Sequence, residues 1–323
     1  MLGDFAIVLG GAAAILAIAE LVIRLTVRLA RHYGLSGSFV GLSILSIGTS
    51  LLEIMIHVVG SVHILRDPAA TATLSAMLLG NNVGSDIFQQ NVALAIVALI
   101  GTVGVVRRQL PMEVGGLIAA SALLWLAAFG GVITRVEGVL LVLAYATWLT
   151  GLARTEANST RALHHTLPRG RAPAFGALIA LCFVAMALIA DPLLGAATRL
   201  VARLPMSASL FGVLVLGICA ALPELMTALV SIRKGQREIS AGILIGSNIT
   251  NPLLAAGLGA TISGYTVPAV LVAYDLPVKI VTGALLYALL WHRSTLNRHE
   301  ALLLIGLYVG YVLVRGALFP GDF

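Results

Sequence analysis

Two glutamates stand inside long apolar stretches of this sequence. Glu53 lies in GLSILSIGTSLLEIMIHVVGS (residues 41–61), and Glu224 lies in the apolar run around residues 204–232. An ionisable side chain at the centre of a bilayer costs roughly 2.5–3.5 kcal/mol on insertion scales. A membrane segment that carries such a group is expected to give it a partner or a function.

Further polar side chains share the face of the helix predicted around Glu53. Ser46, Thr49 and His57 are spaced so that they fall on the same side as this glutamate. Two carboxylates brought together in a low dielectric cannot both stay ionised without a cation. Ca²⁺ fits such a pair, because it accepts six to eight oxygen ligands in flexible geometry. The hydroxyl and amide side chains expected to complete the shell are Ser85, Gln89, Ser247 and Asn251.

The composition places these residues in a membrane protein. Of the 323 residues, 59% are hydrophobic and 11% are charged, whereas a soluble domain is about 25% charged. The mean hydropathy is +1.02. Ten apolar segments are long enough to cross a bilayer. They are predicted at about Phe5–Leu25, Ser36–Leu65, Thr71–Val105, Val114–Phe129, Val132–Leu152, Ala174–Ala190, Leu204–Ile232, Ile239–Ser263, Pro268–Trp291 and Ala301–Leu318.

The net charge of +6 reflects topology and not nucleic-acid binding, because the basic residues lie between apolar runs. Most of them fall in alternate loops, which by the positive-inside rule are cytoplasmic. Both termini are then extracytoplasmic, and the basic linker 154–172 is cytoplasmic. The two cysteines, Cys182 and Cys219, lie in apolar runs and predict no disulfide framework.

Two stretches of the chain resemble each other. GNNVGSDI (residues 80–87) is similar to GILIGSNI (242–249), and each follows a span with one glutamate. The copies are five spans apart, and an odd offset inverts the second copy. The prediction is an all-α membrane protein with two inverted repeats of five helices, residues 1–153 and 173–323. Such repeats are typical of transporters, whose sites lie near the midplane.

The paired motifs resemble the Ca²⁺:cation antiporters, in particular prokaryotic Na⁺/Ca²⁺ exchangers, whose repeats centre on G-T-S-x-P-E and G-N-x-x-G-S-N-I. The matching residues are GTSLLE (48–53) with GNNVGSDI, and CAALPE (219–224) with GILIGSNI. The resemblance implies that Glu53 and Glu224 bind Ca²⁺ and share Na⁺. It also implies side-chain oxygens from Thr49, Ser50, Ser85 and Ser247, backbone carbonyls from Ser46, Gly217 and Ala220, and positions beside the central site for Gln89 and Asn251.

The sequence departs from this pattern at several positions. Ala220 and Ala221 replace the second hydroxyl pair, which removes hydroxyl ligands from at least one Na⁺ site. Asp86 stands where the family has Asn, with structure, ligation or a proton route as alternative roles. His57 is either a hydrogen-bonded interior histidine or a proton acceptor.

The predicted function is Ca²⁺/Na⁺ antiport without a chemical step, a cofactor or an obligate protein partner. The alternatives are H⁺-coupled antiport of Ca²⁺ or another divalent cation on the same scaffold, an uncoupled cation channel and a metal sensor. An enzyme is disfavoured because the sequence shows no nucleophile–base pair.

Three further expectations concern single residues. Asp191 and Pro192 end the sixth span, His63 lies at the outer interface, and Lys279 pairs with Asp275 one helical turn away.

Overall fold

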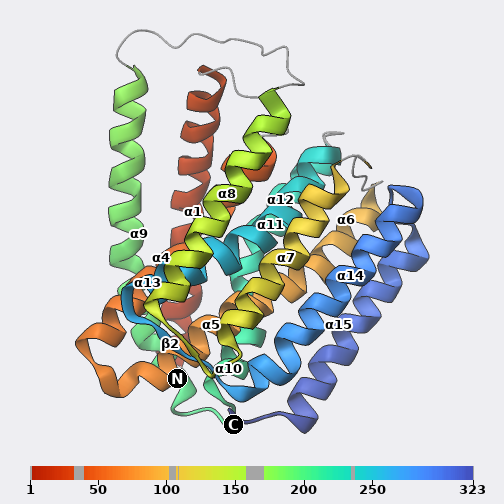
Figure 1. Ribbon diagram of the computed structural model, residues 1–323. Coiled ribbons are helices and arrows are strands. Elements are labelled where there is room, and N and C mark those ends of the chain that lie inside the picture. Colours follow the sequence, from red (N-terminus) through yellow and green to blue (C-terminus); the bar gives the residue numbers. More distant parts are fainter. Residues whose placement is uncertain are drawn as a thin grey trace.

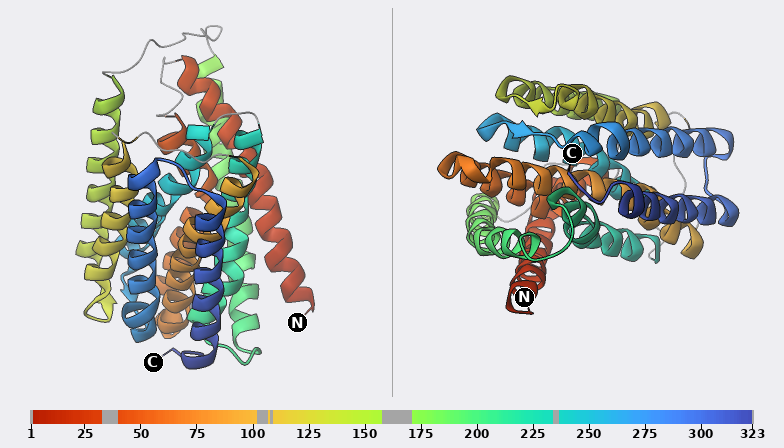
Figure 2. Two further views of the ribbon diagram at one scale, coloured as in Figure 1. Left: turned by 90° about the vertical axis from the view of Figure 1, so that its right-hand side faces the viewer. Right: turned by 90° about the horizontal axis from the view of Figure 1, so that it is seen from below.

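The computed structural model describes residues 2–32, 40–101, 107, 109–157, 171–233 and 237–322. The chain forms a bundle of helices that run roughly side by side (Figure 1). Both termini lie at one end of the bundle, and the linker-facing ends of α8 and α9 lie at the other (Figures 1 and 2). This arrangement fits the predicted placement of both termini on one side of a membrane.

The first half of the chain is almost wholly helical. The segment η2 is a 3₁₀ turn, and η1 and η3 are π turns. Its elements are α1 (Leu2–His32), η1 (Val40–Leu45), α3 (Ser46–Thr49), α4 (Leu51–Arg66), η2 (Pro68–Ala70), α5 (Thr71–Phe88), η3 (Gln89–Ala93), α6 (Leu94–Ile100), α7 (Leu110–Ala128), β1 (Val132–Ile133) and α8 (Arg135–Ala157).

The second half of the chain is also almost wholly helical, with π turns at η4, η5 and η6. Its elements are α9 (Arg171–Val201), α10 (Ala208–Phe211), η4 (Gly212–Leu216), α11 (Gly217–Arg233), α12 (Arg237–Thr250), η5 (Asn251–Ala255), α13 (Ala256–Ser263), β2 (Tyr265–Thr266), η6 (Leu271–Asp275), α14 (Leu276–Arg293) and α15 (Arg298–Leu318).

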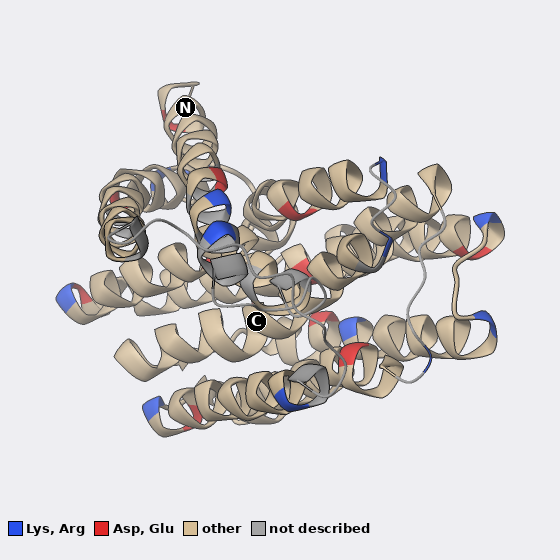
Figure 3. Cartoon of the chain, turned by 90° about the horizontal axis from the view of Figure 1, so that it is seen from above, with Lys and Arg blue, Asp and Glu red and all other residues tan. Residues whose placement is uncertain are grey.

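Eight segments of the described chain are long and apolar enough to cross a membrane. The other two predicted spans correspond to α1 and to the segment η1–α3–α4, which is interrupted at Ser50. Charged residues are sparse along the helices (Figure 3). The outer helices expose leucine and valine, such as Leu188 at 71% and Leu313 at 66%. An apolar exterior of this kind suits contact with lipid.

Two helical segments that each contain a π turn, α5–η3–α6 and α12–η5–α13, form the centre of the bundle. The most apolar stretch of the segment Pro68–Ile100 is 78% buried, and that of Ile239–Ser263 is 89% buried. The corresponding values for α8, α9 and α15 are between 19% and 22%. The central helices therefore bury the predicted ligands, and the outer helices shield them from lipid.

The sixth span differs from its prediction. Helix α9 continues through Pro192 to Val201 and does not end at Asp191. The Asp191 carboxylate instead contacts His63 Nε2 at 2.6 Å. Proline is tolerated in membrane helices because neighbouring groups satisfy the freed backbone. Here α9 packs along α1, and Arg199 of α9 is paired with Asp4 of α1 at 2.8 Å.

A short pair of strands was not expected from the sequence. β1 and β2 are antiparallel, with Val132 opposite Thr266 and Ile133 opposite Tyr265. Gly131 and Gly264 precede the strands with φ of 75° and 71°, values that glycine adopts without strain. The strand pair carries Tyr265 into the buried interior.

Candidate cation-binding site

The two glutamates lie at the centre of the bundle and are fully buried. Glu53 is in the first turn of α4, directly after the interruption at Ser50. Glu224 is in α11, directly after Pro223, which stands inside that helix. The positive end of the α4 dipole favours a carboxylate in its first turn. A local break thus positions Glu53, and a proline marks the position of Glu224.

Close helix packing brings the two glutamate-bearing segments next to the central helices. A Cβ atom on Gly84 of α5 would lie 2.4 Å from the Val213 backbone in η4. A Cβ atom on Gly246 of α12 would lie 2.6 Å from the Leu42 carbonyl in η1. These glycines belong to the two similar stretches of the sequence, and the lack of a side chain lets the helices approach closely. Each central helix thereby packs against the glutamate-bearing segment of the other half of the chain.

Hydroxyl groups contact both carboxyls. Ser85 Oγ of α5 donates to Glu53 Oε1 at 3.0 Å, and Ser50 Oγ donates to Glu224 Oε1 at 3.3 Å. The Thr49 side chain also interacts with Glu224. Glu53 and Glu224 interact electrostatically with each other. Their second oxygens, both buried, accept no hydrogen bond from the described residues, so each carboxyl keeps an oxygen available for a ligand.

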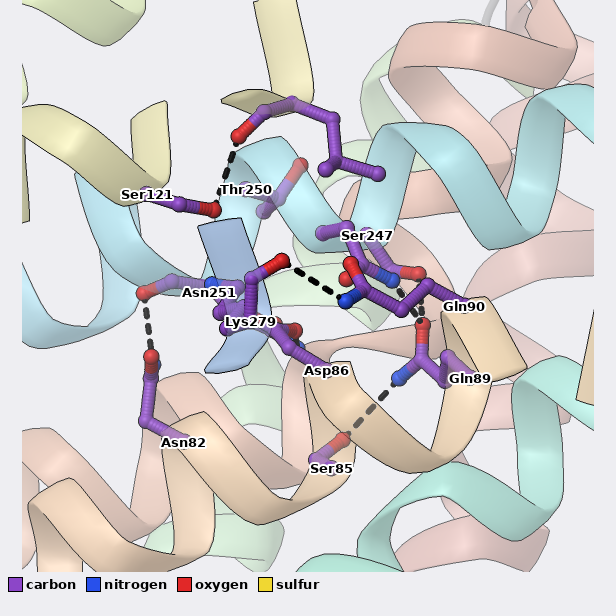
Figure 4. A network of polar contacts seen from close by, with 12 residues as sticks. Asn82, Ser85, Asp86, Gln89, Gln90, Ser121, Ser247, Thr250, Asn251 and Lys279 are labelled. Carbon is purple, nitrogen blue, oxygen red and sulfur yellow. Dashed lines mark hydrogen bonds and ion pairs between the residues drawn. The ribbon is translucent and has the colours of Figure 1, made fainter. Parts of the chain in front are cut away.

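Gln89 connects two of the predicted ligand serines (Figure 4). Its Nε2 atom donates to Ser85 Oγ at 2.9 Å, and its Oε1 atom accepts from the Ser247 hydroxyl. Asn248 Nδ2 also donates to this Oε1 atom, at 3.2 Å. The network joins α5, η3 and α12, so three of the four hydroxyl and amide residues expected around the site are in one continuous chain of contacts.

The fourth, Asn251, belongs to a neighbouring charged cluster (Figure 4). Its Nδ2 atom donates to Asp86 Oδ1 at 2.8 Å, and its carbonyl accepts from Asn82 Nδ2 at 2.7 Å. The other oxygen of Asp86 forms an ion pair with Lys279 Nζ. The expected pairing of Lys279 with Asp275 is therefore wrong, since these two residues lie along one helix and face different partners.

Asp275 has a separate cationic partner. Its carboxylate accepts from Arg315 Nε at 3.1 Å and from the Tyr311 hydroxyl at 2.8 Å. All three side chains are buried. The cluster ties α15 to the end of η6, so Asp275 has a structural role.

The backbone positions implied by the family resemblance are also buried. The Ser46 carbonyl accepts from Ser50 N at 3.0 Å and from Thr49 Oγ1 at 3.2 Å, while the Ser46 hydroxyl lies 2.9 Å from Thr250 Oγ1. A Cβ atom on Gly217 would lie 2.6 Å from Ser85 N. Ala220 is 1% exposed and has no side-chain oxygen. Direct ligation by these three residues stays a prediction.

His57 is fully buried one turn after Glu53 and contacts the strand pair. Its Nδ1 atom lies 2.9 Å from the Tyr265 hydroxyl, which lies 2.8 Å from Ser61 Oγ. Its Nε2 atom has no hydrogen-bond partner among the described residues. The contacts match the expectation of a hydrogen-bonded interior histidine on one side of the ring, and leave the other side free.

The sequence analysis missed several polar residues around the site. Asn248 follows Ser247 directly, and Thr250 precedes Asn251, so both stand beside predicted ligands. Their role could have been inferred from the density of polar residues in this apolar helix. Lys279 offered a stronger signal, because a lysine inside a membrane span requires a partner. The site as a whole offers oxygen atoms and two uncompensated carboxyls, a donor set suited to a hard cation.

The chain is similar to known membrane proteins along nearly its whole length. The family model described as sodium/calcium exchanger protein matches residues 4–153 and 175–316. Inner membrane protein YrbG of Escherichia coli (strain K12) is 28% identical over 306 residues, which cover 90% of each protein. The putative antiporter CaxA of Alkalimonas amylolytica is 27% identical, over 88% of this chain and 89% of that protein.

The fold is similar to that of a solved exchanger. A structure of the sodium-calcium exchanger NCX_Mj, soaked with Na⁺ and without Ca²⁺, has a TM-score of 0.64 at 20% sequence identity, and the match covers 98% of both chains. This likeness shows a shared multi-span helical fold. Together with the family match along nearly the whole sequence, it shows that the chain belongs to the sodium/calcium exchanger protein family.

Proposed function

We propose that this protein exchanges Ca²⁺ for Na⁺ across a membrane, with Glu53 and Glu224 as the shared ligands of the transported ions. The observation that carries the proposal is the pair of buried carboxyls, each bonded to one serine and each with a free oxygen. One Ca²⁺ or two monovalent cations would neutralise the pair. Ser50 and Ser85 hold the carboxyls in place, and Thr49, Ser247 and Gln89 surround them.

Coupling follows from the cost of the empty site. Two ionised carboxylates in a low dielectric repel each other, and the bare pair is too unfavourable to change its exposure from one side of the membrane to the other. Only the loaded forms would then alternate, so the binding of one ion type drives the release of the other. No covalent step, cofactor or enzymatic activity is required.

We further propose that two inverted repeats, residues 1–153 and 173–323, supply the alternating access. Helix α5 of the first repeat packs closely on η4, which leads into the helix with Glu224, and α12 of the second repeat packs on η1, which leads into the helix with Glu53. Each repeat would then move against the glutamate-bearing segment of the other. The inner membrane location in the name of the relative YrbG supports the same location here. The basic linker 154–172 is then cytoplasmic, and both termini lie on the opposite side.

Proton coupling is a second candidate with its own support. His57 lies one turn from Glu53 with a free Nε2 atom, and Ala220 and Ala221 remove hydroxyls that would otherwise help to bind Na⁺. A carboxylate pair accepts protons as readily as Na⁺ in terms of charge. The two candidates therefore differ in the coupling ion and not in the scaffold.

The test is radiolabelled Ca²⁺ uptake into proteoliposomes under an imposed Na⁺ gradient and, separately, under an imposed pH gradient. Na⁺/Ca²⁺ exchange predicts uptake that follows the Na⁺ gradient at constant pH. Uptake that follows only the pH gradient would establish the proton-coupled alternative. A Ca²⁺ current that needs no counter-ion would indicate a channel, and Ca²⁺ binding without any flux would indicate a sensor.

A further inference from the structure

An ion pair lies inside the membrane-spanning part of the bundle, next to the glutamates. Lys279 of α14 and Asp86 of α5 are both 0% exposed, and Lys279 Nζ contacts Asp86 Oδ2. Charged side chains within spans are rare and generally mark functional positions. Removing two charges from water is also costly, so a buried pair is weak evidence for a purely stabilising role.

Two of the four fully buried carboxyls among the described residues have a basic partner. Asp275 forms an ion pair with Arg315, and Asp86 forms one with Lys279. Glu53 and Glu224 have no Lys or Arg partner in the described part of the chain. The fully buried acidic and basic residues are Glu53, Asp86, Glu224, Asp275, Lys279 and Arg315. Within the described part of the chain, two fully buried carboxyls therefore have no Lys or Arg that compensates their charge.

Asp86 is part of the same electrostatic unit as these two glutamates. It follows Ser85, whose hydroxyl donates to Glu53 at 3.0 Å. It accepts a hydrogen bond from Asn251, and its charge acts on both Glu53 and Glu224. Without a cation beside it, Asp86 would be a third negative charge at the site and would attract a third cationic charge.

The matching position in the other half of the chain shows what the lysine adds. In the two similar stretches, Asp86 corresponds to Asn248, and Gln89 corresponds to Asn251. Asn248 Nδ2 donates to Gln89 Oε1 at 3.2 Å, just as Asn251 Nδ2 donates to Asp86 Oδ1 at 2.8 Å. The pair formed by Asn248 and Gln89 is neutral. The pair that contains the carboxylate is the one that Lys279 contacts.

The backbone of Lys279 is fixed against the π turn η3. Gln90 Nε2 donates to the Lys279 carbonyl at 2.9 Å and also contacts the Thr282 hydroxyl. Asn91 Nδ2 reaches the same hydroxyl at 3.3 Å. These amides hold α14 against η3, and they place a compact ammonium charge with three donors beside Asp86.

We propose that Lys279 acts as a covalently attached cation that neutralises Asp86. Only the charges of Glu53 and Glu224 then remain for mobile ions, and one Ca²⁺ exchanges for two monovalent cations. The inference rests on the proposed antiport, but not on whether the monovalent ion is Na⁺ or H⁺. It makes Lys279 the residue that sets the stoichiometry, and it makes the exchange independent of membrane potential.

The first test is the equilibrium Ca²⁺ distribution of wild-type proteoliposomes under a fixed gradient of the coupling ion and a clamped potential. For two-for-one exchange, a tenfold monovalent gradient supports a Ca²⁺ gradient of about 100-fold at every potential. For three-for-one exchange, one net charge moves, and the Ca²⁺ ratio changes about tenfold for every 59 mV. Voltage dependence of that size in the wild type would overturn the inference.

The second test compares variants. K279M leaves Asp86 without its cation, and the Hill coefficient for activation of Ca²⁺ efflux by the monovalent ion is expected to rise from about two to about three. D86N/K279M removes both charges and is expected to return the coefficient to about two. The matched control is D275N/R315M, which removes a different buried ion pair and should leave the coefficient unchanged.

The outcomes separate the inference from the proposed function. A K279M coefficient equal to the wild-type value contradicts the inference alone, as does a coefficient of three in D86N/K279M. If K279M does not fold, the double variant and the wild-type distribution still decide the matter. Absence of Ca²⁺ flux from folded wild-type protein under either gradient contradicts the proposed function, and the inference falls with it.

Discussion

Asn251 donates a hydrogen bond of 2.8 Å to Asp86, a residue 165 positions earlier in the chain. The contact joins η5 to α5 at the first residue of a π turn. The matching contact, between Asn248 and Gln89, meets the first residue of the π turn η3. π turns inside helices are frequent at functional sites. At both places the turn coincides with an amide beside the proposed cation site.

Replacement of either glutamate by glutamine is expected to abolish Ca²⁺ transport. E53Q and E224Q keep the side-chain volume but remove one of the two charges that the divalent ion requires. Transport is measured as Ca²⁺ uptake into proteoliposomes, with size-exclusion chromatography as the test of folding. E137Q at the start of α8, where Glu137 accepts from Thr134, is the matched control and should transport normally. Wild-type flux from both site variants would remove these residues from the site.

Loss of the serine that holds Glu53 is expected to weaken Ca²⁺ binding without abolishing transport. S85A removes the 3.0 Å bond to Glu53 and leaves Gln89 Nε2 without its acceptor. A hydrogen bond to a charged group contributes about 1.5–3 kcal/mol, which corresponds to a rise of roughly 10- to 100-fold in the apparent Kd for Ca²⁺. S121A is the control, since Ser121 donates to the Leu117 carbonyl of its own helix and has no other hydrogen bond among the described residues. An unchanged S85A affinity would show that Ser85 does not support the carboxyl.

A methyl group on Gly84 is expected to destabilise the bundle. Its Cβ atom would lie 2.4 Å from the Val213 backbone, which cannot move away as a flexible side chain could. Overpacking typically costs about 1–3 kcal/mol. Thermal unfolding in detergent should therefore show a lower midpoint for G84A. G306A, where the structure has open space, should match the wild type, and an equal midpoint for both variants would contradict the close packing.

Breaking the ion pair between Asp275 and Arg315 is expected to cost more than removing it entirely. R315M leaves a buried carboxylate whose remaining contact is the Tyr311 hydroxyl, and uncompensated buried charges cost about 3–5 kcal/mol. D275N/R315M should recover most of the loss. The measurement is the thermal midpoint of both variants. A double variant less stable than R315M would show that the pair stabilises the fold beyond charge compensation.

Replacement of His57 is expected to reduce stability but not to change the coupling ion. H57M removes one of two hydrogen-bond partners of the Tyr265 hydroxyl and leaves Ser61 as the other, and the loss of one such bond costs about 0.5–1.5 kcal/mol. The ratio of Na⁺-driven to H⁺-driven Ca²⁺ uptake should stay within about twofold of wild type. Selective loss of the H⁺-driven component would instead assign His57 a role in proton coupling.

Much of the fold follows from the sequence. The long apolar runs determine membrane-spanning helices, because a bilayer requires each backbone group to be bonded within its own segment. The shared order, with Glu53 before GNNVGSDI and Glu224 before GILIGSNI, indicates two related halves that share one site. The glycines in these motifs predict close contacts between helices, and Gly84 and Gly246 lie at such contacts. The two-repeat division itself stays a prediction.

The partners of the buried charges were decided only by the tertiary structure. Spacing along one helix placed Lys279 one turn from Asp275, but Lys279 pairs with Asp86, 193 residues earlier, and Asp275 pairs with Arg315, 40 residues later. Sequence spacing fixes which residues share a helix face. It does not fix which helix lies opposite that face, and π turns and close glycine contacts shift the register further. The charge left for transported ions therefore depends on packing between helices.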